Sequence, residues 1–349
     1  MMPSFSSNAI LAKSKAMYGR RLTEQNYNDL LNCRNVSEVA TYLKARTSYS
    51  DIFEGIATAA IHRGRLEDML KKRLLRQYTS LCRYEKSIGQ NFYKYFIVKN
   101  DITQILNCVR LLYAGHPGDY LFSMPAFFND HTELDLFKLA SITTFADLLD
   151  ALDGSDYKEI LEPFEKTFHD NRSNLYIEAA LYRYFYDQVS ELTIEKLKGK
   201  HLERILDVFR IQSDMRTIVN IYRLKRFLNA DDDLLRQFMI PDISNLKKKQ
   251  LAQLINAPTA EEVLKRLNLT PYGRLLEKID FNYIEGATQK ILYSWNLKTF
   301  RFSSDPTVVM FCYISLAENE INNITHIIEG VRYNVPADEI REMLIGAGN

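Results

Sequence analysis

Asp231, Asp232 and Asp233 form an acidic cluster that could bind a metal ion. In an all-helical chain of this size, a DDxxD motif would indicate an isoprenoid synthase, whose carboxylates hold magnesium against a diphosphate. The final aspartate of that motif is missing, because Leu235 lies four residues after Asp231. We interpret the cluster as an exposed turn whose last aspartate caps a helix beginning at Leu234, and we expect no magnesium site.

The other residue types that perform chemistry do not occur in catalytic patterns. The six histidines form no HExxH motif and no pair four residues apart, so no zinc site is expected. No serine lies in a GxSxG motif, and no cysteine lies in a local signature that contains histidine. Gly199, Lys200 and His201 lack the upstream glycine and the following hydroxyl residue of a phosphate-binding loop. The sequence therefore predicts no catalytic residue, no cofactor and no nucleotide bound by this chain.

Basic residues are the remaining candidates for a functional surface. Two lysine-rich runs, at 196–200 and 247–249, are interpreted as solvated helix faces, with contact to an acidic partner or an anionic membrane surface as the alternative. The range 56–97 contains no proline and is predicted to be helical. Its apolar stripe consists of Leu66, Met69, Leu70 and Leu74. Basic residues beside this stripe are Arg63, Arg65, Lys72, Arg73 and Arg76.

Composition limits the classes of protein that fit. The 349 residues carry 45 basic and 44 acidic side chains, a net charge of +1, which does not predict a nucleic-acid-binding domain. Four cysteines without a CxxC pair, and no signal peptide, predict free thiols in a cytoplasmic protein. The longest strongly apolar run, at 308–317, has 10 residues, whereas a membrane-spanning helix needs about 20. The chain is thus expected to lie near a membrane at most.

A capped amphipathic helix begins at Asn35 and is repeated twice more. Asn35 can cap a helix and Glu38 can complete a capping box, while an aromatic residue, Tyr49, follows the helix. We call this repeated pattern the first anchor. Its three copies consist of Asn35, Glu38, Val39, Leu43, Tyr49 and Phe53, then Thr144, Asp147, Leu148, Leu152, Tyr157 and Leu161, then Thr259, Glu262, Val263, Leu267, Tyr272 and Leu276. We expect the tyrosines to serve packing inside each copy.

A second pattern repeats with the same period. This second anchor consists of Asp101, Ile102, Ile105 and Arg110, then Asp214, Met215, Ile218 and Arg223, then Glu320, Ile321 and Ile324 with Glu329 in place of the arginine. The first anchor recurs after 109 and 115 residues, and the second after 113 and 106. With no alternating hairpin segments, the chain is predicted to be all-α, with helical modules at 1–119, 120–235 and 236–349.

These repeated segments resemble one known family. The opening NAILAKSKAMYGRRLTEQNYNDLL, the segment NVSEVATYLKARTSY and the helix KNDITQILNCVR are similar to the C subunit of bacterial and archaeal V/A-type ATPases, which is related to the d subunit of the vacuolar proton pump. The resemblance extends over essentially the whole chain. It implies a funnel of three like helical modules about a pseudo-threefold axis.

The resemblance also implies a function without catalysis. Such a protein is a socket between the central shaft of the catalytic head and the membrane rotor ring, so that ATP turnover is linked to proton or sodium transport. Its partners would be the shaft and ring subunits, it would touch the membrane only through the ring, and it would be peripheral on the cytoplasmic face. We expect the basic residues beside the stripe at 66–74 to form part of a partner interface.

Two other classes remain as alternatives. One is an all-α enzyme of the isoprenoid-synthase kind, which the incomplete aspartate motif and the threefold repeat disfavour. The other is a helical scaffold of a different complex.

Overall fold

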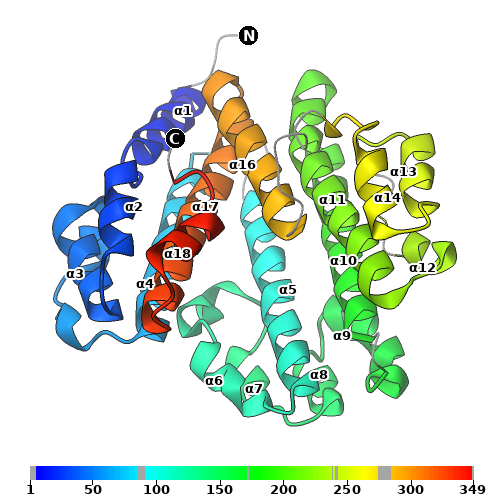
Figure 1. The fold of residues 1–349 in the computed structure, drawn as a ribbon, viewed down its shortest axis with the longest axis horizontal. Coiled ribbons are helices and arrows are strands. Elements are labelled where there is room, and N and C mark those ends of the chain that lie inside the picture. The colour runs from blue at the N-terminus through cyan, green and yellow to red at the C-terminus, as the bar shows by residue number, and fades with distance from the viewer. Residues whose placement is uncertain are drawn as a thin grey trace. The chain divides into compact units, whose positions relative to one another are not determined.

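The computed structural model describes residues 5–84, 91–170, 173–237, 239, 243–273 and 284–347, and every regular element within them is a helix (Figure 1). This confirms the predicted all-α class. The chain divides into two compact units: unit 1 comprises residues 1–89 and 278–349, and unit 2 comprises residues 90–277. The three module boundaries and the arrangement about an axis stay predictions.

Unit 1 combines helices from both ends of the chain. Its elements are α1 (Phe5–Tyr18), α2 (Glu24–Leu31), α3 (Val36–Arg46), the 3-10 segments η1 (Ser48–Phe53) and η2 (Thr58–Ala60), α4 (Arg63–Cys82), α16 (Ile284–Phe302), α17 (Pro306–Arg332) and α18 (Ala337–Met343). Helix α17 packs against α1, α4, α16 and α18 (Figure 1).

The core of unit 1 joins residues that are far apart in the sequence. Leu30, Leu43 and Leu66 from the N-terminal part are fully buried in one cluster with Ile324 and Ile327 of α17. Burying each such side chain contributes about 1.5–3 kcal/mol. The two ends of the chain therefore fold together.

Local sequence explains where α17 begins and how closely α18 approaches it. The Asp305 carboxylate accepts hydrogen bonds from the backbone N–H groups of Thr307 and Val308 at 3.2 and 3.3 Å, and a proline occupies the first helical turn. Near the other end, a Cβ on Gly330 would lie 2.4 Å from Ile340 Cδ1, so glycine permits the close contact with α18.

Unit 2 is built around three long helices. Its elements are α5 (Asn91–Tyr113), η3 (Pro117–Asp119), α6 (Tyr120–Ser123), η4 (Ala126–His131), α7 (Leu136–Leu139), α8 (Phe145–Ala151), α9 (Asp156–Leu161), η5 (Glu162–Thr167), α10 (Ser173–Lys196), α11 (Gly199–Leu228), α12 (Asp232–Gln237), α13 (Lys248–Ile255) and α14 (Ala260–Leu267). Helix α10 packs against α5 and α11, and α11 packs against α14. The ring of Tyr95 lies 5.1 Å from that of Phe185 and 5.3 Å from that of Phe209, between the long helices.

The aspartate cluster lies at the start of α12, but not as expected. The Asp231 carbonyl accepts a hydrogen bond from the Leu235 N–H group at 3.1 Å, and the helix begins at Asp232. Asp233 is therefore inside the helix, and its predicted role as a cap is wrong, because the helical hydrogen bonds begin earlier. The Asp232 carboxylate lies 3.8 Å from the Lys225 ammonium group, so it is paired with a cation of its own unit.

The caps predicted for the first anchor are present in all three copies. The capping side chain accepts a hydrogen bond from the backbone N–H three residues later in the pairs Asn35–Glu38 (2.9 Å), Thr144–Asp147 (3.1 Å) and Thr259–Glu262 (3.2 Å). The full capping box forms in the second copy, where Asp147 accepts from Thr144 N–H at 2.9 Å. In the first copy the longer Glu38 instead accepts from Arg34 N–H at 2.8 Å, one residue earlier than predicted. Leu276 of the third copy lies outside the described residues.

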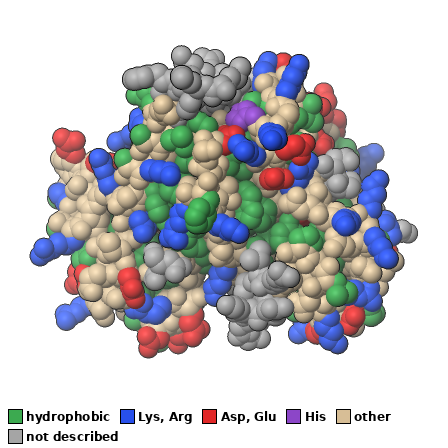
Figure 2. Space-filling view, turned by 90° about the horizontal axis from the view of Figure 1, so that it is seen from above, with side chains coloured by type: hydrophobic (Ala, Val, Ile, Leu, Met, Phe, Trp, Pro, Cys, Tyr) green, Lys and Arg blue, Asp and Glu red, His purple; other side chains and the backbone are tan. Residues whose placement is uncertain are grey.

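Charge is mixed on the face of the molecule that is drawn in space-filling form. Figure 2 shows lysine and arginine side chains interspersed with aspartate and glutamate on one face, and neither sign covers that face. This distribution agrees with the nearly neutral composition.

Candidate functional site

The two repeated patterns meet in three tyrosine–carboxylate pairs. In each pair, the tyrosine of a first anchor donates a hydrogen bond to the acidic residue of a second anchor. The pairs are Tyr49–Glu320 (2.7 Å), which lies in unit 1, and Tyr157–Asp101 (3.4 Å) and Tyr272–Asp214, which lie in unit 2. The sequence predicted both anchors, but not that one binds the other.

In both pairs of unit 2, a second hydroxyl side chain also donates a hydrogen bond to the carboxylate. Thr132 donates to the Asp101 carboxylate and Ser244 donates to the Asp214 carboxylate. Both carboxylates are almost completely buried. Burial raises the pKa of Asp214 and raises the pKa of Asp101 to about 7, because a charged carboxylate loses its hydration there.

The pair in unit 1 is arranged differently. Glu320 on α17 accepts from Tyr49 and, at 2.8 Å, from the backbone N–H group of Leu22. Its side chain is only partly shielded, because it lines a cavity. Burial raises the pKa of Glu320, and its hydrogen bonds and the charge of Arg73 oppose that rise. Unlike its counterparts in unit 2, this residue lines a cavity.

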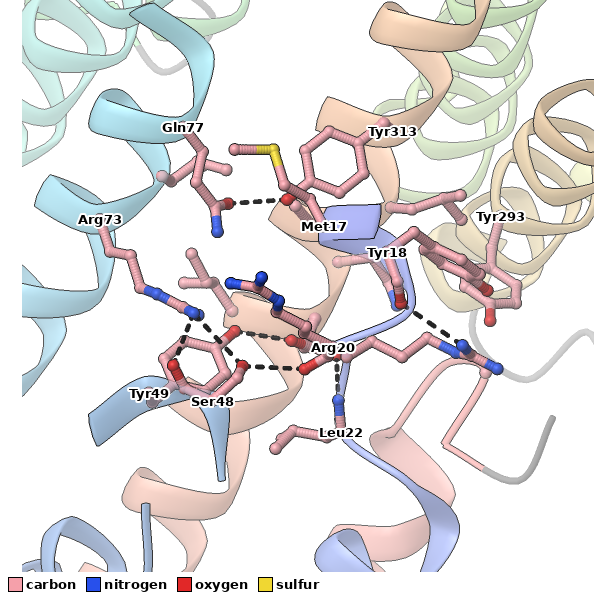
Figure 3. A pocket seen from close by; sticks show the side chains of 18 of the residues that line it. Met17, Tyr18, Arg20, Leu22, Ser48, Tyr49, Arg73, Gln77, Tyr293 and Tyr313 are labelled. Carbon is pink, nitrogen blue, oxygen red and sulfur yellow. Dashed lines mark hydrogen bonds between the residues drawn. The ribbon is translucent and has the colours of Figure 1, made fainter. Parts of the chain in front are cut away.

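The cavity beside Glu320 has a volume of about 190 Å³ and lies entirely within unit 1 (Figure 3). Aromatic and aliphatic side chains from α1, α4, α16 and α17 form much of its wall. On one side, Tyr313 donates a hydrogen bond to Gln77 of α4 at 3.0 Å. The Tyr18 hydroxyl is buried beside the side chain of Tyr293.

Arg73 forms a fixed part of the cavity wall. Its guanidinium group donates to the Ser48 carbonyl at 2.7 Å, lies 3.1 Å from the Asp51 carboxylate and stacks over the Tyr49 ring at 4.1 Å. These contacts hold the η1 segment, and with it the Tyr49 hydroxyl, against α4 (Figure 3). The role of Arg73 in the described structure is thus internal.

Two further arginines at the cavity have no carboxylate partner among the described residues. Arg21 stacks over the Tyr18 ring at 4.4 Å, and its guanidinium group donates a hydrogen bond of 3.4 Å to the Tyr18 carbonyl. Arg20 is exposed. Its guanidinium group forms no ion pair and no hydrogen bond with the described residues. A more open hollow next to the cavity shares both arginines and adds Lys44 and Arg46, and its described lining contains no acidic side chain.

The five basic residues predicted as a partner interface are not brought together. Arg63 pairs with Glu67 and Glu329, each at 2.6 Å, and Arg73 lies in the cavity wall. The other three, Arg65, Lys72 and Arg76, are exposed. Their spacing places them along one face of α4, because positions seven and eleven residues apart lie on the same side of a helix.

Three of the four cysteines, Cys33, Cys108 and Cys312, do not favour a reactive thiol. Burial raises the pKa of Cys33 to about 11 and the pKa of both Cys108 and Cys312 to about 12. Each therefore stays protonated at neutral pH, whereas a nucleophilic cysteine needs a lowered pKa.

One repeated feature was missed in the sequence. A buried leucine stands immediately before the N-cap of α2, α7 and α13, and these leucines are Leu22, Leu134 and Leu246. They recur at intervals of 112 residues. Counting back two residues gives Arg20, Thr132 and Ser244, so the arginine in unit 1 occupies the repeat position of the two hydroxyl residues in unit 2. This third period could have been found by aligning the caps.

The described residues form an all-helical protein in which polar residues that recur in the sequence tie distant segments together. A sequence model of the ATP synthase (C/AC39) subunit family matches residues 10–343, and the chain belongs to that family. It is 24% identical to the C subunit of the A-type ATP synthase of Methanosarcina mazei over 96% of this chain and 91% of the relative. The corresponding C subunits from Methanobrevibacter smithii and Archaeoglobus fulgidus are 25% and 23% identical over 96% of this chain, and over 86% and 95% of their own lengths. The isoprenoid-synthase alternative has no support from these relatives.

Proposed function

We propose that the protein is a non-catalytic central-stalk subunit of a rotary ATP synthase, and that it couples the shaft of the catalytic head to the membrane rotor ring. The observation that carries the proposal is the family match over residues 10–343. The relatives are named as C subunits of A-type ATP synthases, the class of complex in which such a coupler works.

The internal structure suits a part that transmits torque. Three tyrosine–carboxylate pairs tie segments that are 56, 58 and 271 residues apart. Closely packed helical interiors deform little, so a chain held in this way can pass on rotation without local unfolding. In the proposed arrangement, three like modules surround a socket for the shaft, and the opposite side contacts the ring on the cytoplasmic face of the membrane.

Membrane contact is proposed to be indirect, through the ring. Among the described residues, no helix combines the length and the apolar character needed to cross a bilayer. The ion that the complex would transport, proton or sodium, depends on the ring.

The exposed face of α4 is the proposed partner contact. Arg65, Lys72 and Arg76 lie there without an ion pair to any described residue. Arg63 and Arg73 are left out of this contact, because both are engaged inside unit 1. Charged groups at the rim of an interface steer association and fix its register.

A charge-reversal experiment tests this proposal. The triple variant Arg65→Glu, Lys72→Glu, Arg76→Glu is expected to bind the remaining ATP synthase subunits about tenfold or more weakly at low salt. The matched control reverses three exposed charges elsewhere in unit 1, Lys15→Glu, Arg34→Glu and Lys290→Glu. Co-purification from membranes and titration with the purified shaft and ring subunits give the measurement. Equal binding by both triple variants and the unmodified chain would remove α4 from the interface, and failure of the unmodified chain to join the complex would contradict the function.

A further inference from the structure

We propose that the cavity of unit 1 is a binding site for a small tetrahedral oxyanion, of the phosphate or sulfate type, held by Arg20 and Arg21. The repeat provides an internal reference for this inference. At the position of Arg20, the two copies in unit 2 have Thr132 and Ser244, which turn inward and donate to their buried carboxylates. Arg20 makes no such contact with Glu320.

The described lining of the cavity has one more arginine than carboxylate: Arg20, Arg21 and Arg73 against Asp51 and Glu320. Arg73 is paired with Asp51, and Glu320 is engaged by Tyr49 and the backbone of Leu22. Neither Arg20 nor Arg21 forms an ion pair with a carboxylate among the described residues, although the charge of Arg21 acts on Glu320, and both arginines line the cavity and the adjoining hollow. Guanidinium groups bind oxyanions well, because they can donate two parallel hydrogen bonds.

The size and the donors of the cavity select the class of ligand. About 190 Å³ admits a compact group but not a helix or a folded segment of a partner. Lys44 and Arg46 border the adjoining hollow, so the approach to the cavity is also positively charged. The buried Tyr18 hydroxyl lies beside Tyr293 at the cavity wall. Together these groups offer charge-assisted and neutral hydrogen bonds to an anion with several oxygens.

The test uses the full-length chain and isothermal titration calorimetry with sodium sulfate and sodium phosphate. Total ionic strength is held constant with sodium chloride, because exposed charges are screened by salt. Arg20→Thr introduces the residue that the second copy has at this position, and Arg21→Gln removes the other charge. Arg34→Thr is the control, since Arg34 is exposed in the same unit and does not line the cavity. Circular dichroism checks that each variant is folded.

The expected result is one saturable site, with affinity reduced about tenfold or more by Arg20→Thr and by Arg21→Gln, and changed less than twofold by Arg34→Thr. Comparison of inorganic phosphate with glycerol phosphate then distinguishes a free anion from an esterified headgroup as the source of the same phosphoryl chemistry. No saturable binding, an equal loss in all three variants, or binding of hexaglutamate but of neither sulfate nor phosphate would overturn the proposal. None of these results bears on the coupling function, which rests on the family match.

Discussion

The tyrosine–carboxylate pair of unit 1 and the two pairs of unit 2 share a hydrogen bond but differ in what surrounds it. In unit 2, Asp101 and Asp214 are closed off by the hydroxyls of Thr132 and Ser244. In unit 1, the longer Glu320 meets a backbone N–H group and faces a cavity. Two copies are therefore purely internal contacts, whereas the third combines an internal contact with an accessible pocket.

The difference coincides with a change at one repeat position. Where unit 2 has Thr132 and Ser244, which donate to their carboxylates, unit 1 has Arg20, which lines the cavity and makes no hydrogen bond to Glu320. Arg73 then supports Tyr49 from the side, through Ser48 and the aromatic ring. The tyrosine–carboxylate hydrogen bond is retained at 2.7 Å.

The largest difference is expected when each carboxylate is removed. Asp214→Ala leaves three donors, Tyr272, Ser244 and the Asn245 N–H, without their acceptor in a buried site. We expect the free energy of unfolding to fall by about 3 kcal/mol or more, because each unsatisfied buried donor costs about 1–3 kcal/mol. Glu320→Ala should cost only about 1–2 kcal/mol, since water in the polar cavity can bind Tyr49 and Leu22 in its place.

Urea unfolding of both variants measures these values. Each variant removes a carboxylate that accepts a hydrogen bond from a tyrosine. A difference between the two variants therefore reports on their surroundings and not on the loss of a carboxylate alone. Equal destabilisation by the two substitutions would show that the cavity does not admit water to Glu320, and would remove the distinction between the units.

A second difference is expected in the pH dependence of stability. The pKa of Asp101 is raised from 3.8 to about 7 in the folded chain, so between these values the folded state binds more protons than the unfolded state. Its contribution to stability therefore falls as pH rises from about 4 to about 7, by up to about 1.4 kcal/mol per pH unit. Asp101→Asn, which resembles the protonated form, should be close to the unmodified chain at pH 4 and progressively more stable than it toward pH 7.

The matched substitution in unit 1 is Glu320→Gln. The pKa of Glu320 is also raised, but the nearby charges of Arg73 and Arg21 oppose the rise, so the same comparison should give a shallower slope. Unfolding free energies at pH 4, 5, 6 and 7 provide the measurement. Two results would contradict the distinction between the enclosed carboxylates of unit 2 and the cavity-lining carboxylate of unit 1. One is a stability difference that changes more steeply with pH for Glu320→Gln than for Asp101→Asn, and the other is no pH dependence for Asp101→Asn.

Much of the helical structure could be predicted from the sequence, because caps and apolar periodicity act locally. Asn35, Thr144 and Thr259 each lie where a capping side chain is followed by an acidic residue three positions later, and all three cap a helix. Asp233 shows the limit of this reasoning, since several aspartates in a row offer more than one place for a helix to begin.

The candidate site was harder to predict, because it depends on contacts between distant segments. The basic group on α4 contains Arg63 and Arg73, which are paired inside unit 1, as well as Arg65, Lys72 and Arg76, which are exposed. Nothing in the local pattern separates these two sets. Their partners Glu329 and Asp51 come from other elements, and only the fold brings them within reach.

The most direct test of the coupling function compares the complete ATP synthase with the same complex assembled without this chain. ATP hydrolysis and ion uptake are measured together in sealed vesicles. We predict that the complex lacking the chain still hydrolyses ATP but no longer drives ion uptake, and that adding the purified chain restores uptake. Ion uptake that persists without the chain, or ATP hydrolysis by the purified chain itself, would contradict the proposed role.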